Sequence, residues 1–274
     1  MVLNKPVRII SSKPLTIGTY FKEILKYREL VLVFSGQEIK AMYAQTFFGI
    51  FWVIMRPLLT LGIFTIIFRF FLHVPTQAPY YLFAFAGLIA WNLFSQIAMT
   101  ASVAIIQKQQ LIHKMYFPKL ILPLSKVVVA AIETGISLLL FFVFLLVEQL
   151  PVSISVFTLP LFIMLNVNCG LAIAIWMNAL NVRFRDLNQI IPAVIGIAIW
   201  VTPVFYPTTI IPHGYQFFVY VNPMAGIIKG YRFALLGETF PEWQYWISIS
   251  VSVLIAIAGI FYLSKVEDKI VDFA

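Results

Sequence analysis

Charged residues are scarce in this chain of 274 residues. Asp, Glu, Lys and Arg make up 11% of the sequence and hydrophobic residues 61%, whereas about 25% of the residues in a soluble domain are charged. Four stretches, 70–107, 149–182, 187–228 and 243–264, contain none of these four residue types. A helix needs about 20 mostly apolar residues to cross the hydrocarbon core. The sequence therefore predicts an all-α polytopic membrane protein.

Signals for metal or covalent chemistry are equally scarce. Cys169 is the single cysteine and lies in an apolar run, which excludes an intrachain disulfide and indicates no metal cluster. The chain has no GxxxxGK[ST] phosphate loop, no HExxH and no GxSxG. We therefore predict a protein that is not itself an enzyme, that binds no metal and that holds no cofactor.

The basic residues predict the membrane topology. We place six transmembrane helices, listed as spans at about 46–71, 80–106, 120–147, 154–178, 189–206 and 243–263. With the N-terminus in the cytoplasm, all of the 19 Lys and Arg except Arg69, Lys229 and Arg232 fall on the cytoplasmic side. Basic residues near span ends stay cytoplasmic, so both termini are expected inside. Residues 1–45 would form a cytoplasmic tail and residues 46–274 the six-helix domain.

The net charge of +8 does not indicate nucleic acid as a partner, because the basic residues form no single patch. Membrane lipids are the expected surroundings.

The tail contains an amphipathic pattern over 17–34. Apolar residues from Ile17 to Phe34 recur at spacings of three or four, which predicts a helix with one apolar face. This helix would lie along the inner interface of the membrane or pack against the cytoplasmic ends of its own bundle. Ser35 and Glu38 then fit a capping box, which predicts that a new helix begins there after a sharp bend.

A second cytoplasmic segment, 107–119, is short, basic and partly apolar. It is either a projection that binds another protein or an ordinary loop whose basic residues follow the charge rule. The residues that would form the projection are Lys108, Leu111, Ile112, His113, Lys114, Met115 and Tyr116.

The outer segment 204–242 is largely apolar but is broken by four prolines. Asn222-Pro223 is a typical helix start and Gly237 a typical stop, which predicts a short helix over 223–236. A helix of this length is too short to span the membrane. The segment therefore forms re-entrant outer helices between spans 5 and 6, or a folded cap on the outer surface.

Several side chains are candidates for a transport path. Glu133 is the carboxylate placed well inside a span; it is functional or makes a hydrogen-bonded contact with Asn or Gln. Aromatic side chains between 43 and 94 either form an interfacial belt or line a passage, where their faces would contact sugar rings. The aromatic candidates are Phe51, Trp52, Tyr80, Tyr81 and Trp91.

Five runs of sequence resemble the membrane subunit of bacterial ABC-2-type polysaccharide exporters, which export O-antigen, capsule or teichoic-acid chains. The runs are EIKAMYAQTFFGIFWVIMRPLLT, LIHKMYFPKLILPLS, NVRFRDLNQIIP, TPVFYPTTIIP and VNPMAGIIKGYRFALLG. The resemblance covers about residues 25–265. Met42 departs from the family pattern, because a basic residue is expected before Tyr43.

The resemblance implies a permease subunit in the bacterial inner membrane that forms a homodimer and pairs with two copies of a separate ATPase. ATP and Mg would be bound by that ATPase. Segment 107–119 would be the coupling helix, 17–34 the interface helix and 207–237 the outer gate. The implied cargo is a glycan, O-antigen first among the possibilities, on a polyprenyl diphosphate. Arg56, Lys229 and Arg232 would then meet the diphosphate, unless they serve only as headgroup anchors at the ends of their helices.

Three other functions remain open on sequence alone. The chain would be an ABC-2 permease for small lipophilic drugs or lipids, an intramembrane glycosyl- or acyltransferase, or an ion-coupled carrier. The second needs a cluster of acids or histidines, which the sequence lacks. The third often shows an internal repeat with paired broken helices, whereas only the second half of this chain has a broken segment.

Overall fold

The computed structural model describes residues 17–44, 46–112, 114–115, 117–181, 184, 186–239, 246–255 and 257–259. Every regular element within these ranges is a helix, as the sequence predicts. Four helical stretches are long and apolar enough to cross a membrane: Trp52–Phe71, Tyr80–Ala101, Ile121–Val147 and Ile154–Asn178. They match the first four predicted spans. The fifth and sixth predicted spans correspond to the shorter apolar helices Leu187–Val201 and Trp246–Gly259, so the count of six spans stays a prediction.

The elements follow one another along the chain with short connections. In order they are α1 (Ile17–Lys26), α2 (Arg28–Tyr43), η1 (Gly49–Phe51), α3 (Trp52–Thr65), η2 (Ile66–Phe71), α4 (Tyr80–Ala101), α5 (Ala104–Gln107), α6 (Gln109–Ile112), α7 (Ile121–Val147), η3 (Ile154–Thr158), α8 (Leu159–Asn181), α9 (Leu187–Val201), η4 (Thr208–Ile210), α10 (His213–Val221) and α11 (Pro223–Leu236).

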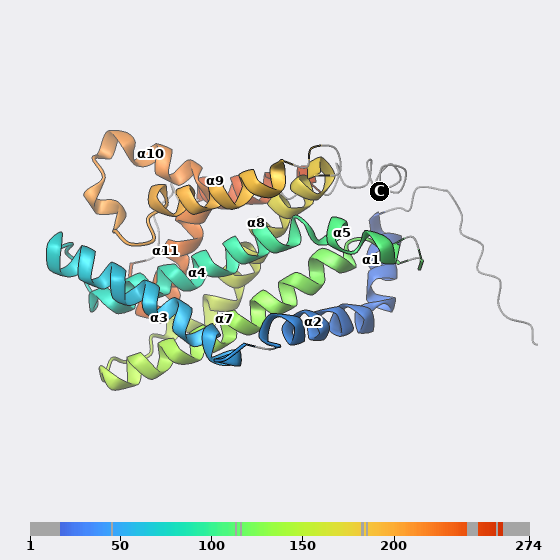
Figure 1. Ribbon diagram of the computed structural model, residues 1–274. Coiled ribbons are helices and arrows are strands. Elements are labelled where there is room, and N and C mark those ends of the chain that lie inside the picture. Colours follow the sequence, from blue (N-terminus) through green and yellow to red (C-terminus); the bar gives the residue numbers. More distant parts are fainter. Residues whose placement is uncertain are drawn as a thin grey trace, which may run out of the picture.

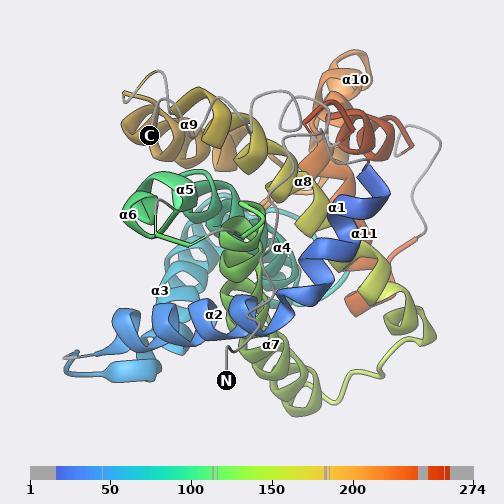
Figure 2. The same cartoon turned by 90° about the vertical axis from the view of Figure 1, so that its right-hand side faces the viewer.

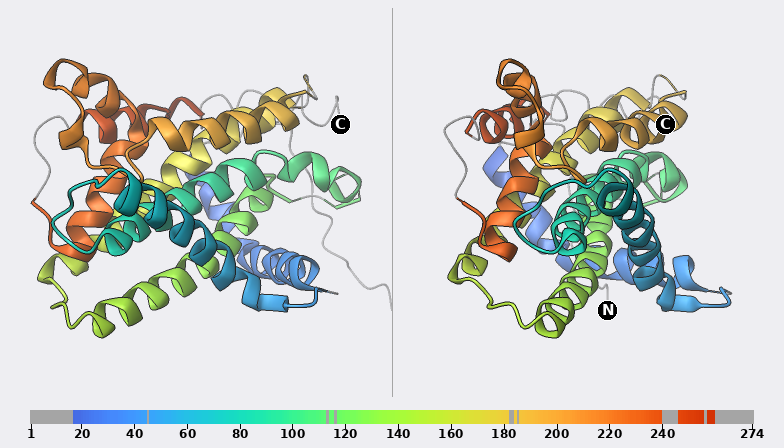
Figure 3. Two further views of the ribbon diagram at one scale, coloured as in Figure 1. Left: turned by 60° about the vertical axis from the view of Figure 1, so that its left-hand side comes forward. Right: turned by 90° about the vertical axis from the view of Figure 1, so that its left-hand side faces the viewer.

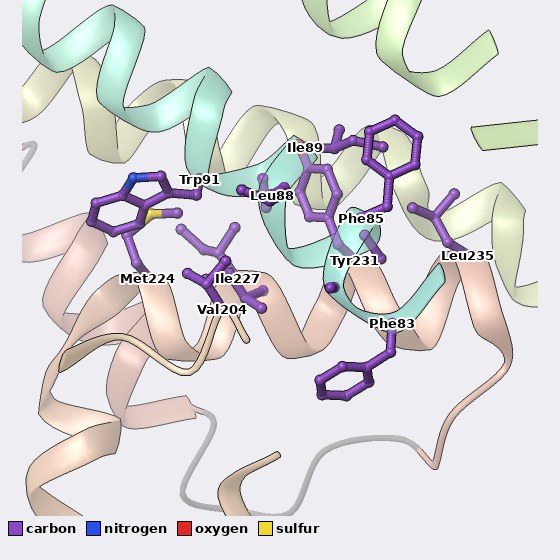
Figure 4. Close-up of a cluster of buried hydrophobic side chains, with 14 of the residues drawn as sticks. Phe83, Phe85, Leu88, Ile89, Trp91, Val204, Met224, Ile227, Tyr231 and Leu235 are labelled. Atoms are coloured by element: carbon purple, nitrogen blue, oxygen red, sulfur yellow. The ribbon is translucent and has the colours of Figure 1, made fainter. Parts of the chain in front are cut away.

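Helix α4 is the centre of the molecule. It packs against α3, α7, α8 and α11, which surround it in the views of Figures 1 and 3. In the most apolar stretch of α4, 83% of the residues are buried, against 17% in α3–η2 and 22% in α7. Figure 4 shows its side chains interleaved with those of α11, as where Trp91 and Leu88 lie beside Met224 and Ile227. Helix α4 thus lies in protein, and α3 and α7 expose apolar faces.

The two ends of the bundle differ in what they carry. Helices α1 and α5 lie at one end, and α10 and the far end of α3 lie at the other (Figure 1). Seen from the first end, α1, α2, α5 and α6 lie in front (Figure 2). The tail helices and the basic segment 107–119 therefore share one end, which the charge rule predicts to be the cytoplasmic end.

Asparagines of α8 fix that helix to α4. The Nδ2 atoms of Asn166, Asn178 and Asn181 donate to backbone carbonyls of Ala90, Ala101 and Ser102. The last carbonyls of a helix have no partner within it. Because hydrocarbon supplies no water to these groups, side chains from α8 stabilise the end of α4.

The predicted capping box is wrong. Ser35 lies inside α2, where its Oγ donates to the carbonyls of Val31 at 2.7 Å and Ser125 at 3.0 Å. The Glu38 carboxylate forms an ion pair with Lys126 of α7 instead of reaching back to Ser35. The helix breaks instead at Tyr27, between α1 and α2, and again after α2. Ser35 and Glu38 both bond to residues of α7, so neither side chain caps a helix.

The tail packs on the bundle. Phe34 is buried in a cluster with Ala104, Phe117 and Ile121, and Leu30 and Val31 are partly buried against it. Of the two placements predicted for the apolar stripe, α2 therefore adopts the one against the cytoplasmic ends of its own bundle.

Some span boundaries also differ from the predicted ones. The helix of the first span begins at Trp52, not at 46, and changes to a π-helix at Ile66. The helix of the second span ends at Ala101, five residues before the predicted boundary at 106. Helix α7 matches the third predicted span within one residue at its start.

The predicted helix over 223–236 is confirmed as α11. The Asn222 side chain accepts a hydrogen bond from the Met224 N–H at 3.0 Å, and Pro223 occupies the first turn. Gly237 ends the helix with φ +68°, a left-handed conformation that glycine adopts without strain.

We predict that Gly87→Ala destabilises the protein. A Cβ at Gly87 would lie 2.7 Å from the backbone oxygen of Val204, and a backbone atom in a packed core cannot move aside cheaply. The expected cost is about 1–3 kcal/mol, seen as a lower melting temperature of the purified protein. Gly196→Ala in α9 is the control, since a Cβ there meets nothing within 4 Å. Equal melting temperatures for the two variants would contradict the close approach at Gly87.

Candidate functional site

A cavity of about 570 Å³ opens between the end of α2, α3, α4 and α7. Both polar and apolar side chains reach it. Its lining consists of Met42, Tyr43, Thr46, Trp52, Val53, Arg56, Pro57, Thr60, Ile89, Asn92, Ser95, Gln96, Met99, Thr100, Glu133, Thr134 and Ser137. Three sequence candidates, Trp52, Arg56 and Glu133, therefore face one space.

The partner of Glu133 is Tyr43. The Tyr43 hydroxyl donates to Oε1 of Glu133 at 2.8 Å, so the predicted Asn or Gln partner is wrong. Burial and the neighbouring carboxylate raise the pKa of Tyr43 above its ordinary value. The phenol therefore stays protonated and remains the donor, and the carboxylate of Glu133 keeps its remaining acceptor capacity for the cavity.

Arg56 supplies positive charge to the same cavity. Its side chain is exposed, and it forms no ion pair within the part of the chain that the structure describes. A guanidinium offers five donors in a planar fork that matches a phosphate or carboxylate. Arg56 is thus free to bind an anion that enters between α3 and α7.

Amide and hydroxyl groups on α4 complete the polar lining. Asn92, Gln96 and Thr100 follow one another at intervals of four residues, which places them on one face of the helix. Sequence reasoning missed them, although their spacing within an apolar run was a usable signal. Together with Tyr43 and Glu133 they can donate to and accept from the hydroxyls of a sugar.

The aromatic candidates separate into two groups. Phe51 and Trp52 are 46% and 38% exposed, and Trp52 lines the cavity with its ring against that of Phe48. Trp91 is only 4% exposed and belongs to the core between α4 and α11 (Figure 4). Tyr80 is also buried, and its hydroxyl donates to the Phe205 carbonyl at 2.8 Å.

Tyr81 lies near the start of α4, where its hydroxyl donates to the carboxylate of Glu148. Tyr80 and Tyr81 both line a second cavity at this end of the bundle. Of the five aromatic candidates, Trp52 lines the first cavity, Tyr80 and Tyr81 line the second and Trp91 lies in the core, whereas Phe51 is exposed and lines neither cavity.

Arg232 is held inside the protein. It is 3% exposed, and its guanidinium donates to the carbonyls of Val204 at 2.6 Å and Phe83 at 3.4 Å. The guanidinium carbon also lies 3.5 Å from the centroid of the Phe83 ring. Lys229 is partly exposed, so of the two basic residues of α11 only Lys229 reaches the surface. A headgroup cannot reach Arg232 in this arrangement, which joins α11, α4 and the turn after α9.

The basic segment 107–119 begins at the end of α5 and contains one short helix, α6, and its described residues after Ile112 are not helical. Leu111 and Ile112 pack against the Phe34 cluster, and Nζ of Lys108 lies 6.0 Å from the centroid of the Phe34 ring. Lys114 and Met115 are exposed, with Met115 at 50%. His113 and Tyr116 lie outside the described residues. Among the described coupling candidates, Lys114 and Met115 are therefore the most accessible to a partner.

Comparisons with known proteins extend over most of the chain. A family model described as ABC-2 type transporter matches residues 29–236. The chain is 27% identical over 241 residues to an O-antigen export system permease protein RfbA of Klebsiella pneumoniae, covering 87% of this chain and 92% of that protein. It is also 27% identical over 253 residues to an O-antigen export system permease protein RfbA of Myxococcus xanthus, covering 90% of this chain and 96% of the relative.

We predict that Tyr43→Phe lowers stability by leaving the Glu133 carboxylate without its donor. Loss of a hydrogen bond to a charged group costs about 1.5–3 kcal/mol, which thermal unfolding of the purified protein would register. Tyr215→Phe, at an exposed tyrosine of α10, is the control. If both variants melt at the temperature of the wild type, the hydrogen bond does not hold α2 against α7.

Proposed function

The chain belongs to the ABC-2 type transporter family, and on this premise we propose that it is the membrane subunit of an ATP-driven exporter of lipid-linked polysaccharide, O-antigen in particular. Its multi-pass helical structure and its relatives fit the bacterial inner membrane. The observation that carries the proposal is the cavity between α3, α4 and α7, which combines Arg56 with sugar-compatible amides, hydroxyls and Trp52.

The cargo follows from the chemistry of this lining. A polyprenyl-diphosphate glycan presents an anion, sugar hydroxyls and a hydrocarbon chain. Arg56 suits the anion, Asn92 and Gln96 suit the hydroxyls, and Trp52 offers an aromatic face. A small lipophilic drug would leave most of these polar groups without partners at a cost, so the lining favours the glycan. The names of the relatives, which are O-antigen export permeases, support the same cargo.

Energy would come from a separate ATPase. The chain has no phosphate loop, and a transporter of this class needs ATP and Mg bound elsewhere. We propose that two ATPase copies serve a homodimer of this chain and that each touches the exposed tip at Lys114 and Met115. Helices α5 and α6 pack on the Phe34 cluster. A displacement of Lys114 and Met115 by the ATPase would therefore be transmitted to α2 and α7, which border the cavity.

The homodimer is proposed from exposed apolar surface. Helix α3 exposes Leu59 and Ile63, and α9 exposes Val194, Ile197 and Trp200. Lipid would cover part of this surface. We propose that a second copy of the chain packs against the rest of this apolar surface. The cavities of the two copies would then lie on either side of a shared path for a glycan chain that is longer than one cavity.

The outer gate in this proposal is the segment before α11. Arg232, and Asn222 through the hydrogen bond that its Nδ2 donates to Oγ1 of Thr202, fix α11 to the core, whereas α10 exposes Tyr215, Phe217 and Phe218. Displacement of η4 and α10 over residues 207–221 therefore breaks fewer buried contacts than displacement of α11. We propose that these residues move aside when the chain is exported.

We predict that the double variant Lys114→Glu, Met115→Asp loses its ATPase. The two side chains are exposed, so the substitutions should leave the fold intact while introducing negative charge at the contact. Copurification of the ATPase with the tagged permease measures the effect. Lys40→Glu, at an exposed lysine of α2, is the charge control. Undiminished copurification and export in the double variant would remove the coupling role from this tip.

We predict that both Arg56→Lys and Arg56→Gln reduce export and that Arg56→Gln reduces it more. Lys keeps the charge and loses the fork, and Gln loses both, so the loss for Gln should be about tenfold or more. Surface O-antigen measured at equal membrane levels of the permease gives the readout. Arg28→Gln, at an exposed arginine of α2, should export normally. Full export by Arg56→Gln would show that no anion binds there.

A further inference from the structure

A second cavity, of about 420 Å³, lies where α3 ends and α4 begins. Its lining consists of Thr65, Arg69, Phe70, Thr76, Gln77, Ala78, Pro79, Tyr80 and Tyr81. We propose that this cavity binds the diphosphate headgroup of the lipid carrier on the outer side of the membrane, with Arg69 as its principal ligand. The inference rests on the proposed function and adds a binding site that the sequence did not indicate.

Arg69 is the available cation on this side. Of the three basic residues that the charge rule places outside, Arg232 is buried against two carbonyls and Lys229 is partly buried on α11. Arg69 is exposed, lines the cavity and forms no ion pair with any residue that the structure describes. None of the described residues that line the cavity is a carboxylate, and the nearby Glu148 already accepts from the Tyr81 hydroxyl.

The start of α4 adds backbone donors to the same cavity. Tyr80 and Tyr81 are the first residues of a helix of 22 residues, and no side chain caps it. The first hydrogen bonds to the preceding turn come from the N–H groups of Leu82 and Phe83, which donate to Pro79. Within the described ranges the N–H groups of Tyr80 and Tyr81 have no acceptor. Free N–H groups at a helix start bind phosphate well, because the helix dipole adds positive potential there.

The Thr65 hydroxyl is a third, independent observation. It lines the cavity and is buried, yet it has no hydrogen-bond partner among the described residues. A buried hydroxyl without a partner carries a cost of about 1–3 kcal/mol unless a ligand or water satisfies it. Thr65 is also the last residue of α3 before the π-helix η2, which carries Arg69. π-helical turns occur often at functional sites.

The position of this cavity fits an outer headgroup. It lies at the end of α3 that is opposite to α1 and α5 (Figure 1), whereas Arg56 lies in the first turns of the same helix. Thirteen residues separate the two arginines, which corresponds to about 20 Å along a helix, short of the full hydrocarbon thickness of about 30 Å. A carrier whose headgroup leaves Arg56 would thus meet a second guanidinium further along α3, toward the outer leaflet.

The test measures binding, not transport. The full-length protein is purified into phosphatidylcholine nanodiscs and irradiated with a photoreactive polyprenyl diphosphate, and crosslinked peptides are mapped by mass spectrometry. Peptides covering 65–81 should carry the probe. Arg69→Gln should lower this labelling about tenfold or more, and Arg69→Lys should lower it less. Unchanged labelling of these peptides in Arg69→Gln overturns the proposal.

Thr65→Val separates a binding role from a structural one. Since the hydroxyl has no partner among the described residues, its removal should leave the melting temperature unchanged or raise it, while labelling of 65–81 falls. Thr209→Val, at an exposed threonine of η4 that does not line the cavity, should change neither quantity. A lower melting temperature with unchanged labelling would assign Thr65 to the fold alone and remove it from the site.

Two competition arms identify the source of the anion. Inorganic pyrophosphate should displace the probe from 65–81, and phosphatidylglycerol added to the nanodisc should not. If phosphatidylglycerol displaces it equally well, the cavity binds ordinary anionic lipid and the carrier site is overturned. Labelling of the peptides around Arg56 but never of 65–81 overturns this inference alone, whereas no labelling of either region counts against the proposed cargo as well.

Discussion

Hydrocarbon contains no water to satisfy a broken helix, and this constraint governs how the bundle is held together. The chain breaks after α9, and the carbonyls freed there are bound by side chains from other elements. Arg232 donates to the carbonyl of Val204 and Tyr80 to that of Phe205, while the Phe205 ring stacks on Phe64 at 3.5 Å. One turn therefore joins α3, α4, α9 and α11. The buried charge of Arg232 is tolerated because its guanidinium donates to the carbonyls of Val204 and Phe83 and lies against the Phe83 ring.

The same constraint divides α4 into two faces with different duties. One face packs into the core against α8 and α11, and its end is stabilised by Asn178 and Asn181. The other face presents Asn92 and Gln96 to the cavity beside α3 and α7. A buried central helix thus positions the polar groups, and α2, α3 and α7 border the cavity on its other sides. This arrangement suits a path that must open and close without exposing the core.

Local signals in the sequence predicted those features that depend on local physics. Apolar runs gave the first four spans, and the Asn222, Pro223 and Gly237 signals gave α11 with its correct ends. Ser35 and Glu38 misled, because their partners Ser125 and Lys126 lie about 90 residues away and outcompete a cap. The cavity depends on the approach of α3 to α4 and α7, so its lining could not be assembled from spacing alone. Only Trp52, Arg56 and Glu133 were found in advance.

The basic residues on the outer side show that the predicted side of the membrane does not by itself indicate which residue can bind an anion. The charge rule puts Arg69, Lys229 and Arg232 outside, and composition treats them alike. The fold distinguishes them. Arg232 donates to carbonyls that hydrocarbon would leave unpaired. Arg69 lies on a π-helical turn and lines the same cavity as Tyr80 and Tyr81, whose N–H groups have no acceptor among the described residues. A guanidinium already satisfied by the backbone gains little from a phosphate, since it would have to give up those hydrogen bonds. A guanidinium without such partners gains the whole free energy of a charge-assisted hydrogen bond to the phosphate. Burial and hydrogen bonding within the protein, not the side of the membrane, therefore determine which basic residue can bind an anion.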